Sequence, residues 1–429
     1  MKIKIIFIFF SFLFSFLHAE EDLKYFVNKA IDNNLKLSAE RKNLEAAKQE
    51  KNISRSEFLP NVTISGDQTS TTSTNRINQS GSTLSDTNLD SESKSISLEQ
   101  TIFSGFKGLN TFKKSELETQ RATLKFKSAE QQTILDTAIA YFDLIFKIKN
   151  EKFNISNVNL FERQVESDSA RLQKGEITLT DLAQSESSLA GANANLIKAK
   201  TELLSSKTNF ERVTRQNIPK FENLDENVNL VLPNTLKESL ELSNLNNLSL
   251  LIAKLDLEIA NKNLSIERAR LSPSASIKVS KTENQDFSST IDEQDDETVK
   301  ATITWPIIKG GENISSIKKS SLNKQRAQYL LEDAKNKVNS EIFKSWSKFQ
   351  SSKSVLEATK AQLKAAEIAN EGITLEYDSG SSRTTLELIQ SRSLLLDARI
   401  ASAKAERDFL VSQFELAKQI GMLSPNSIK

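Results

Sequence analysis

Two long segments of the chain, 106–172 and 311–376, carry apolar residues at helical spacing and contain no proline. The recurring apolar positions are Ile134, Ala138, Tyr141, Ile145 and Ile148 in the first segment, and Leu330, Ala334, Val338, Ile342, Trp346 and Phe349 in the second. Spacings of three and four residues are typical of a helix that buries one narrow apolar face. At a rise of ~1.5 Å per residue, each segment predicts a helix of about 100 Å. An ordinary globular domain cannot hold such a helix, so we expect an elongated molecule.

The two segments are related by a fixed offset. Gly105 and Gly310 are 205 residues apart, and so are Gly175 and Gly380. Matching features at equal spacing over such a length indicate an internal repeat. We therefore interpret the chain as two tandem copies of one unit.

Before each long segment the pattern changes to alternation of apolar and polar residues. Val62 and Ile64, for example, alternate with polar neighbours, and a period of two predicts β-strands. Four strands are expected, at about 60–66, 94–103, 274–281 and 298–308. The Ser/Thr/Asn-rich segment 68–93 predicts a loop, and so does segment 282–297, which has seven acidic residues and no basic one.

Shorter helices complete each copy. They are expected at about 22–57, 181–215, 236–271 and 385–421, with Asn246 and Asn247 as a candidate break in the third. The expected fold class is therefore mainly α-helical with a small β part, built from internally duplicated long antiparallel hairpins. The first copy spans 20–218, the second spans 235–429, and 219–234 connects them. In each copy, two half-length helices match one long helix, so both hairpin turns should lie at one end of the molecule and all strands at the other.

The first 19 residues have the pattern of a secretory signal. Lys2 and Lys4 precede the apolar run Ile5–Leu17, and the segment ends at Ala19. The run is too short to span a bilayer comfortably. We therefore expect a cleavable signal rather than a membrane anchor, and an exported mature chain.

Composition argues against several functional classes. The chain has 57 Lys and Arg against 56 Asp and Glu, a balance that gives no indication of a nucleic-acid partner. It has no cysteine, and its one histidine, His18, lies in the predicted signal. The mature chain thus lacks the commonest proton shuttles, thiol nucleophiles and soft metal ligands. We expect neither an enzyme nor a metal or cofactor site.

Four strands cannot close a barrel by themselves. Membrane barrels have at least about eight strands, and an open sheet edge is not tolerated in lipid. We therefore expect several chains to pool their strands in an outer membrane. Phe58, Phe103 and Trp305 lie at the expected strand–helix junctions, where they either form an interfacial girdle or pack the junction. The alternative is a periplasmic coiled-coil adaptor or structural protein without a barrel, although two hairpins, each preceded by a strand pair, favour the duct.

The chain resembles the TolC-like family of outer-membrane efflux and secretion channels. Segments 100–105 (QTIFSG) and 305–311 (WPIIKGG) look like the family's junction of strand and long helix, and 175–182 and 380–390 look like its two hairpin turns. The resemblance covers essentially the whole mature sequence. It implies a homotrimer with a twelve-stranded β-barrel in outer-membrane lipid and an α-barrel in the periplasm. Such a passive duct docks on a periplasmic adaptor protein, which links it to an inner-membrane transporter for efflux or type I secretion.

The resemblance also implies an entrance gate near the hairpin turns. Polar links between neighbouring hairpins close the periplasmic tip in the family. The matching positions here are Thr180, Asp181, Tyr377 and Arg383, and an Asp181–Arg383 ion pair would be a breakable link.

Two further kinds of position follow from the same resemblance. Glu387 and Gln390 match the constriction, where the family often has two acids and this chain has one. Gly175 and Gly380 mark the hairpin tips that would contact the adaptor.

Overall fold

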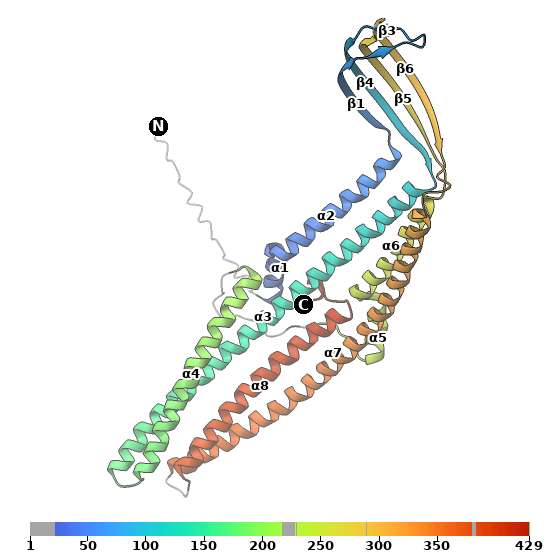
Figure 1. The fold of residues 1–429 in the computed structure, drawn as a ribbon. Helices are drawn as coiled ribbons and strands as arrows, with labels where there is room; N and C mark the ends of the chain where they lie inside the picture. The colour runs from blue at the N-terminus through green and yellow to red at the C-terminus, as the bar shows by residue number, and fades with distance from the viewer. Residues whose placement is uncertain (1–21, 217–227, 229, 289, 380–382, 429) are drawn as a thin grey trace, which may run out of the picture.

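The computed structural model describes residues 22–216, 228, 230–288, 290–379 and 383–428. The predicted signal segment 1–19, most of the connector 219–234, and Gly380 lie outside these residues. The described chain is elongated, with the strands gathered at one end and the ends of the helical hairpins at the other (Figure 1).

The eight α-helices of the described residues divide equally between the two copies. They are α1 (Leu23–Asn33), α2 (Leu35–Arg55), α3 (Lys107–Gln173) and α4 (Leu179–Thr214), then α5 (Leu236–Asn246), α6 (Leu248–Ala269), α7 (Glu312–Asp378) and α8 (Thr385–Gln419). The strands are β1 (Asn61–Ser73), β2 (Arg76–Ile77), β3 (Thr83–Leu84), β4 (Thr87–Ser104), β5 (Ser274–Ser288) and β6 (Ile291–Thr304).

The long helices α3 and α7 organise the two copies. Each has 67 residues, and their starts at Lys107 and Glu312 differ by 205 positions (312 − 107). α2 and α4 pack along successive parts of α3, and α6 and α8 do the same along α7. α3 also contacts α6 and α8, so the two copies lie side by side.

Asparagine interrupts the first helix of each copy. The helix expected at 22–57 breaks at Asn34, whose side chain accepts a hydrogen bond from the Leu37 N–H at 3.1 Å and caps α2. Asn247 does the same for α6 through the Leu250 N–H at 3.1 Å, and its amide donates to the Gln419 carbonyl at 2.7 Å. Asparagine favours such caps because its side chain replaces a missing backbone partner. Only the second break was anticipated from the sequence.

An aromatic core lies where the half-length helices meet. Phe26 of α1 packs on Tyr141 and Phe210, with ring centroids 6.0 and 5.0 Å apart. Phe142 packs on Phe414 of α8 at 5.8 Å. Because these rings come from α1, α3, α4 and α8, this core joins the first copy to the last helix.

The two long helices differ in how far one chain buries their apolar faces. Ile134 and Ala138 of α3 are fully buried. On α7, Val338 and Ile342 are buried, whereas Leu330 is 50% exposed. Within one chain, α3 has neighbours on two sides and α7 on one.

Four strands form one antiparallel sheet in the order β1-β4-β5-β6, with β2 and β3 as a small separate hairpin. β4 pairs with β5 from Glu92 to Ser104, which joins the sheet across the two copies. β1 and β6 form the two edges.

The sheet has one face with an apolar row and one polar face. Val62, Leu98, Val279 and Val299 lie in one row across all four strands. Their neighbours in sequence form the row Thr63, Ser97, Ser280 and Thr298 on the opposite face. Val299 is 76% exposed and Val62 is 58% exposed, so a single chain leaves this apolar row uncovered.

The strands extend beyond the expected bounds. β1 and β4 continue through much of the segment expected as a loop, to Ser73 and from Thr87. The acidic segment 282–297 is also largely paired, with Lys281 opposite Glu297 and Glu283 opposite Asp295. These parts of the strands were not predicted because both faces of the sheet are polar there. The alternation of apolar and polar residues, on which the strand prediction depended, is therefore absent.

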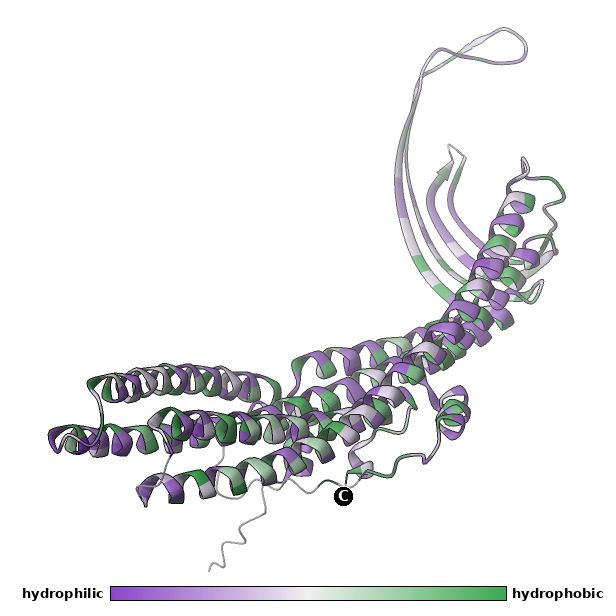
Figure 2. Ribbon diagram, turned by 90° about the horizontal axis from the view of Figure 1, so that it is seen from below, coloured by the Kyte–Doolittle hydropathy of each residue, from purple (hydrophilic) through white to green (hydrophobic). Residues whose placement is uncertain are grey.

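Hydrophilic and hydrophobic residues are interspersed along the helices (Figure 2). Over the part of the chain that the structure describes, none of the helices is both long enough and apolar enough to span a membrane.

Replacement of Gly105 should destabilise the protein more than replacement of its counterpart Gly310. Both have positive φ, 62° and 54°, but a Cβ at Gly105 would lie 2.4 Å from the Ser272 Cβ and 2.8 Å from the Ala269 carbonyl oxygen, whereas Gly310 has open space. We expect Gly310→Ala to cost about 1–2 kcal/mol and Gly105→Ala ~2–5 kcal/mol. Thermal loss of helical circular dichroism in detergent measures both, and equal shifts would contradict the proposed close contact.

Candidate functional site at the hairpin tips

The first hairpin turn follows the end of α3 at Gln173. Gly175 has φ 75°, and its N–H donates to the Leu172 carbonyl at 2.9 Å. A glycine in this left-handed conformation is a common helix end because it lacks a Cβ. The turn is therefore short, and α4 begins at Leu179 with Thr178 as its N-cap.

Both hairpins start their return helix with the same capping box. The Thr178 hydroxyl accepts from the Asp181 N–H at 3.2 Å, and the Asp181 carboxylate accepts from the Thr178 N–H at 2.9 Å. In the second copy, the Thr384 hydroxyl accepts from the Glu387 N–H at 3.2 Å, and the Glu387 carboxylate accepts from the Thr384 N–H at 2.8 Å. The carboxylates of Asp181 and Glu387, both predicted as site residues, therefore cap the N-termini of α4 and α8.

These local contacts also favour the ionised form of the two carboxylates. The hydrogen bonds from the Thr178 side chain and backbone lower the pKa of Asp181. The Thr384 backbone bond, with help from Arg383, lowers the pKa of Glu387. Both residues thus stay negatively charged over the pH range of ordinary growth, because an unperturbed carboxyl is already ionised there.

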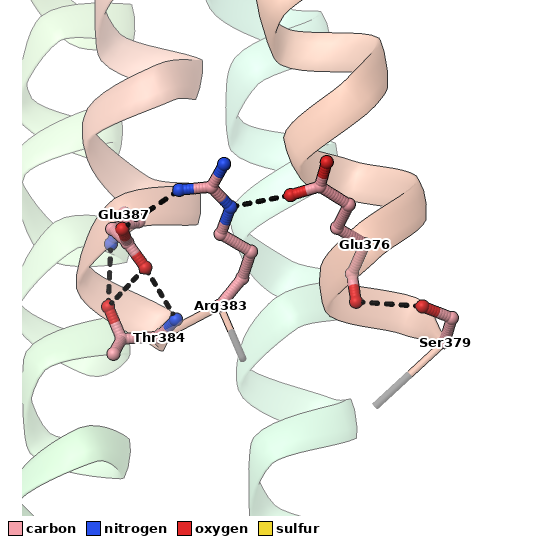
Figure 3. A network of polar contacts seen from close by, with 5 residues as sticks. All are labelled: Glu376, Ser379, Arg383, Thr384 and Glu387. Atoms are coloured by element: carbon pink, nitrogen blue, oxygen red, sulfur yellow. Dashed lines mark hydrogen bonds and ion pairs between the residues drawn. The ribbon is translucent and has the colours of Figure 1, made fainter. Parts of the chain in front are cut away.

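Arg383 binds two acids of its own hairpin (Figure 3). Its Nε lies 2.6 Å from the Glu376 Oε2, and one terminal nitrogen lies 3.1 Å from the Glu387 Oε1. The Asp181 carboxylate is engaged by Thr178. Within one chain, these contacts take the place of the expected Asp181–Arg383 pair, and a link between neighbouring chains remains a prediction.

Tyr377 joins the two hairpins through a buried carboxylate. Its hydroxyl donates to the Asp168 Oδ1 at 2.9 Å and lies 3.2 Å from the Thr385 hydroxyl. Gln164 and Ser185 also donate to Asp168, at 2.9 and 2.6 Å. Asp168 is fully buried, so three donors replace its lost hydration. We call these five residues the Asp168 cluster.

Two arginines flank the Asp168 cluster. The Arg171 guanidinium lies 4.8 Å from the centre of the Tyr377 ring, in cation–π contact. Arg392 of α8 donates to the Gln164 side chain at 3.0 Å and to the Leu160 carbonyl at 3.4 Å. Burial lowers the pKa of Arg392 and raises that of Tyr377, so the phenol stays protonated as a donor.

Sequence reasoning predicted Tyr377 but missed the rest of the Asp168 cluster. The buried face of α3 continues toward the tip with mostly polar residues at intervals of three and four: Asn150, Asn154, Asn157, Phe161, Gln164 and Asp168. The spacing of these residues indicates a buried helix face, but the prediction from sequence considered apolar residues only and therefore missed it.

The remaining predicted positions are Thr180, Gln390, Gly175 and Gly380. Thr180 is exposed in the first turn of α4, and Gln390 is exposed in the second turn of α8. Gly175 is at the tip of the first hairpin, and Gly380 lies outside the described residues. In the described part of the chain, no group of three or more His, Cys, Asp or Glu side chains is placed to hold a metal ion.

The sequence profile of the outer membrane efflux protein family matches residues 26–214 and 240–422, which correspond to the two copies. The chain therefore belongs to the outer membrane efflux protein family. This membership favours a duct over a periplasmic adaptor, and the family consists of passive channels rather than enzymes.

Individual relatives match over nearly the whole chain. Outer membrane efflux protein BepC of Brucella suis is 23% identical over 405 residues, which cover 93% of this chain and 85% of BepC. Outer membrane protein TolC of Vibrio cholerae is 24% identical over 416 residues, which cover 95% of this chain and 92% of TolC.

The fold is also that of solved channels. The structure of the CmeC outer membrane channel of Campylobacter jejuni superposes with a TM-score of 0.81 at 17% identity, covering 93% of this chain and 85% of CmeC. The expected fold class is confirmed: long duplicated helical hairpins of an α-barrel, with four strands per chain for a β-barrel.

Removal of the Tyr377 hydroxyl should loosen the joint between the hairpins. Tyr377→Phe leaves the buried Asp168 with two donors, which we expect to cost about 1–3 kcal/mol. The matched control is Tyr329→Phe on the same helix, where the ring is 72% exposed. Hydrogen exchange should accelerate in residues 372–379 and 385–392 of the Tyr377 variant only, and equal exchange in both variants would contradict the assignment.

Proposed function

We propose that this chain forms, as a homotrimer, the outer-membrane duct of a tripartite efflux or secretion system. The duct has no chemistry of its own. Its helical tips dock on a periplasmic adaptor, which links it to an inner-membrane transporter, and its strands lie in outer-membrane lipid. The observation that carries the proposal is that one chain already contains the contact by which the next chain would be added.

The sheet supplies the first half of this argument. β4, the last long strand of the first copy, pairs with β5, the first strand of the second. β1 and β6 have one neighbour each in the sheet. Because β6 is the repeat counterpart of β4, and β1 of β5, pairing β6 with β1 of the next chain repeats the β4–β5 contact. Both free edges then gain the backbone hydrogen bonds that lipid cannot supply.

The helices supply the second half. The contact of α3 with α6 and α8 has the counterpart α7 against α2 and α4 of the next chain. α7 carries an exposed apolar stripe on the face opposite Val338 and Ile342. The stripe consists of Ile314, Leu322, Tyr329, Phe343, Ile368 and Leu375, which are 49–72% exposed. A stripe of this kind on a soluble helix marks an interface.

The number of chains follows from closure. A head-to-tail contact makes a ring when its rotation closes. With four strands per chain, three chains give twelve strands, an even number above the minimum of about eight for membrane barrels. Three is also the number that the family resemblance implies.

The apolar row of the sheet would face the lipid. Phe58, Phe103 and Trp305 at the strand–helix junctions are 49%, 39% and 62% exposed, which favours an interfacial girdle over simple packing. The Trp305 indole N–H donates to the Leu271 carbonyl at 3.0 Å, so its polar group has a partner. Export to this location would use the predicted signal segment 1–19.

The tip would act as the entrance gate. Thr180, Asp181, Tyr377 and Arg383 provide polar links between neighbouring hairpins, and partly exposed ion pairs among them are worth ~1 kcal/mol or less, so docking can break them. Gly175 and Gly380 would lie at the adaptor contact.

A ring of Glu387, with Gln390 one turn further along α8, would form the constriction. Each chain contributes Glu376 and Glu387 against Arg383, so the ring keeps a net negative charge and should favour cations.

Planar-bilayer recordings test the proposed duct. The full-length protein should open pores with a cation preference, and Glu387→Gln should reduce that preference because it removes one carboxylate per chain from the narrowest ring. Glu332→Gln, on α7 away from the tip, is the matched control and should leave selectivity unchanged. The absence of any pore would contradict the duct, whereas pores unaffected by Glu387→Gln would contradict only the constriction.

A further inference from the structure

Near the tip, the second hairpin has an apolar groove on its surface. The groove lies between α7 and α8 and has a volume of about 450 Å³. Its apolar lining consists of Ala365, Ala366, Ala369 and Ile373 from α7 and Leu394 from α8. Arg383 and Glu387 border it toward the turn.

The internal repeat identifies the counterpart of this groove in the first copy. Subtracting 205 from the α7 positions gives Leu160, Phe161, Gln164 and Asp168 on α3. Those residues form the surface of the first hairpin on which the second hairpin packs, because Arg392 bonds to Leu160 and Gln164, and Tyr377 bonds to Asp168. The groove is thus the repeat equivalent of an interface that exists within the chain.

The repeat also identifies the side chains that would enter the groove. Within the chain, Tyr377 of the second hairpin bonds to Asp168 of the first, and Thr385 lies 3.2 Å from the Tyr377 hydroxyl. The counterparts of Tyr377 and Thr385 are Leu172 (377 − 205) and Leu179 (385 − 206). The offset of 206 is that of the two N-cap residues, Thr178 and Thr384 (384 − 178). Leu179 is 70% exposed in the single chain, although it is a large apolar residue.

The joint within the chain and the proposed joint between chains differ in polarity, and in each the two sides match. Where the first copy has Gln164 and Asp168, the groove has Ala369 and Ile373; where the second copy has Tyr377 and Thr385, the first has leucines. Polar residues therefore meet polar residues within the chain, and apolar residues would meet apolar residues between chains. Mixing the two joints would place a leucine against the buried Asp168 carboxylate, which costs free energy because the carboxylate would lose its donors.

We infer that the groove on α7 and α8 receives Leu172 and Leu179 of the next copy of this chain, so that polar and apolar joints between hairpins alternate around the entrance. This inference rests on the proposed ring of chains. The groove lies on the part of α7 nearest the tip. A second copy fits it because the repeat supplies both the surface and the side chains that fill it.

Paired cysteines test the apolar joint, and the chain has no cysteine of its own. Leu179→Cys combined with Ile373→Cys, treated in the detergent-purified full chain with a short bismaleimide cross-linker, should give covalent dimers and trimers on a denaturing gel. Arg171→Cys with Tyr377→Cys is the matched within-chain pair and should run as a monomer. Leu179→Cys with Ile314→Cys, at opposite ends of the molecule, should give no cross-linked species.

The outcomes separate the inference from the proposed function. If native mass shows a trimer but the Leu179–Ile373 pair gives only monomer bands, the groove is open to another occupant, such as an adaptor hairpin, and the inference is wrong. If the protein is a monomer in detergent before any reagent is added, the proposed ring fails as well. Covalent trimers from this pair, with monomers from the within-chain pair, support both.

Discussion

An unpaired edge of a β-sheet cannot face lipid, because its N–H and C=O groups have no other hydrogen-bond partner there. The sheet of this chain has two such edges, β1 and β6, and an exposed row of valine and leucine between them. In outer-membrane lipid, edge and row together would require that further chains complete the sheet. The helices would also need further chains, because α7 packs against helices of its own copy on one side and exposes an apolar stripe on the other.

Duplication provides one way to meet this requirement. In the proposed ring, the contact between the two copies within a chain would be the pattern for the contact between chains, so one geometry would repeat. The copies differ in chemistry where the hairpins meet near the tip. Asp168 in the first copy corresponds to Ile373 in the second, and Leu179 to Thr385. A ring built from one geometry can therefore contain two kinds of joint with different chemistry.

The long helices could be predicted because packing between neighbouring helices buries one face of each. Apolar residues such as Tyr141 therefore recur every three or four positions in the sequence. The break at Asn34 was missed because a capping asparagine looks like an ordinary polar residue on a helix. The strand extension to Ser73 was missed where both faces are polar. Asp168 was missed because a buried polar position resembles a surface one in sequence. For Asp181, sequence alone could not distinguish a helix cap from a link to another chain, since a carboxylate serves either purpose.

The central claim is that three chains complete one sheet and one ring of hairpins. The mass of the detergent-extracted protein, measured by native mass spectrometry and again on a denaturing gel after boiling, tests it most directly. The account predicts a species of three 48.0 kDa chains, less any signal removed, that dissociates to single chains on heating. A water-soluble monomer with the same helical content would contradict it, because its open edges and apolar row would then need no partner.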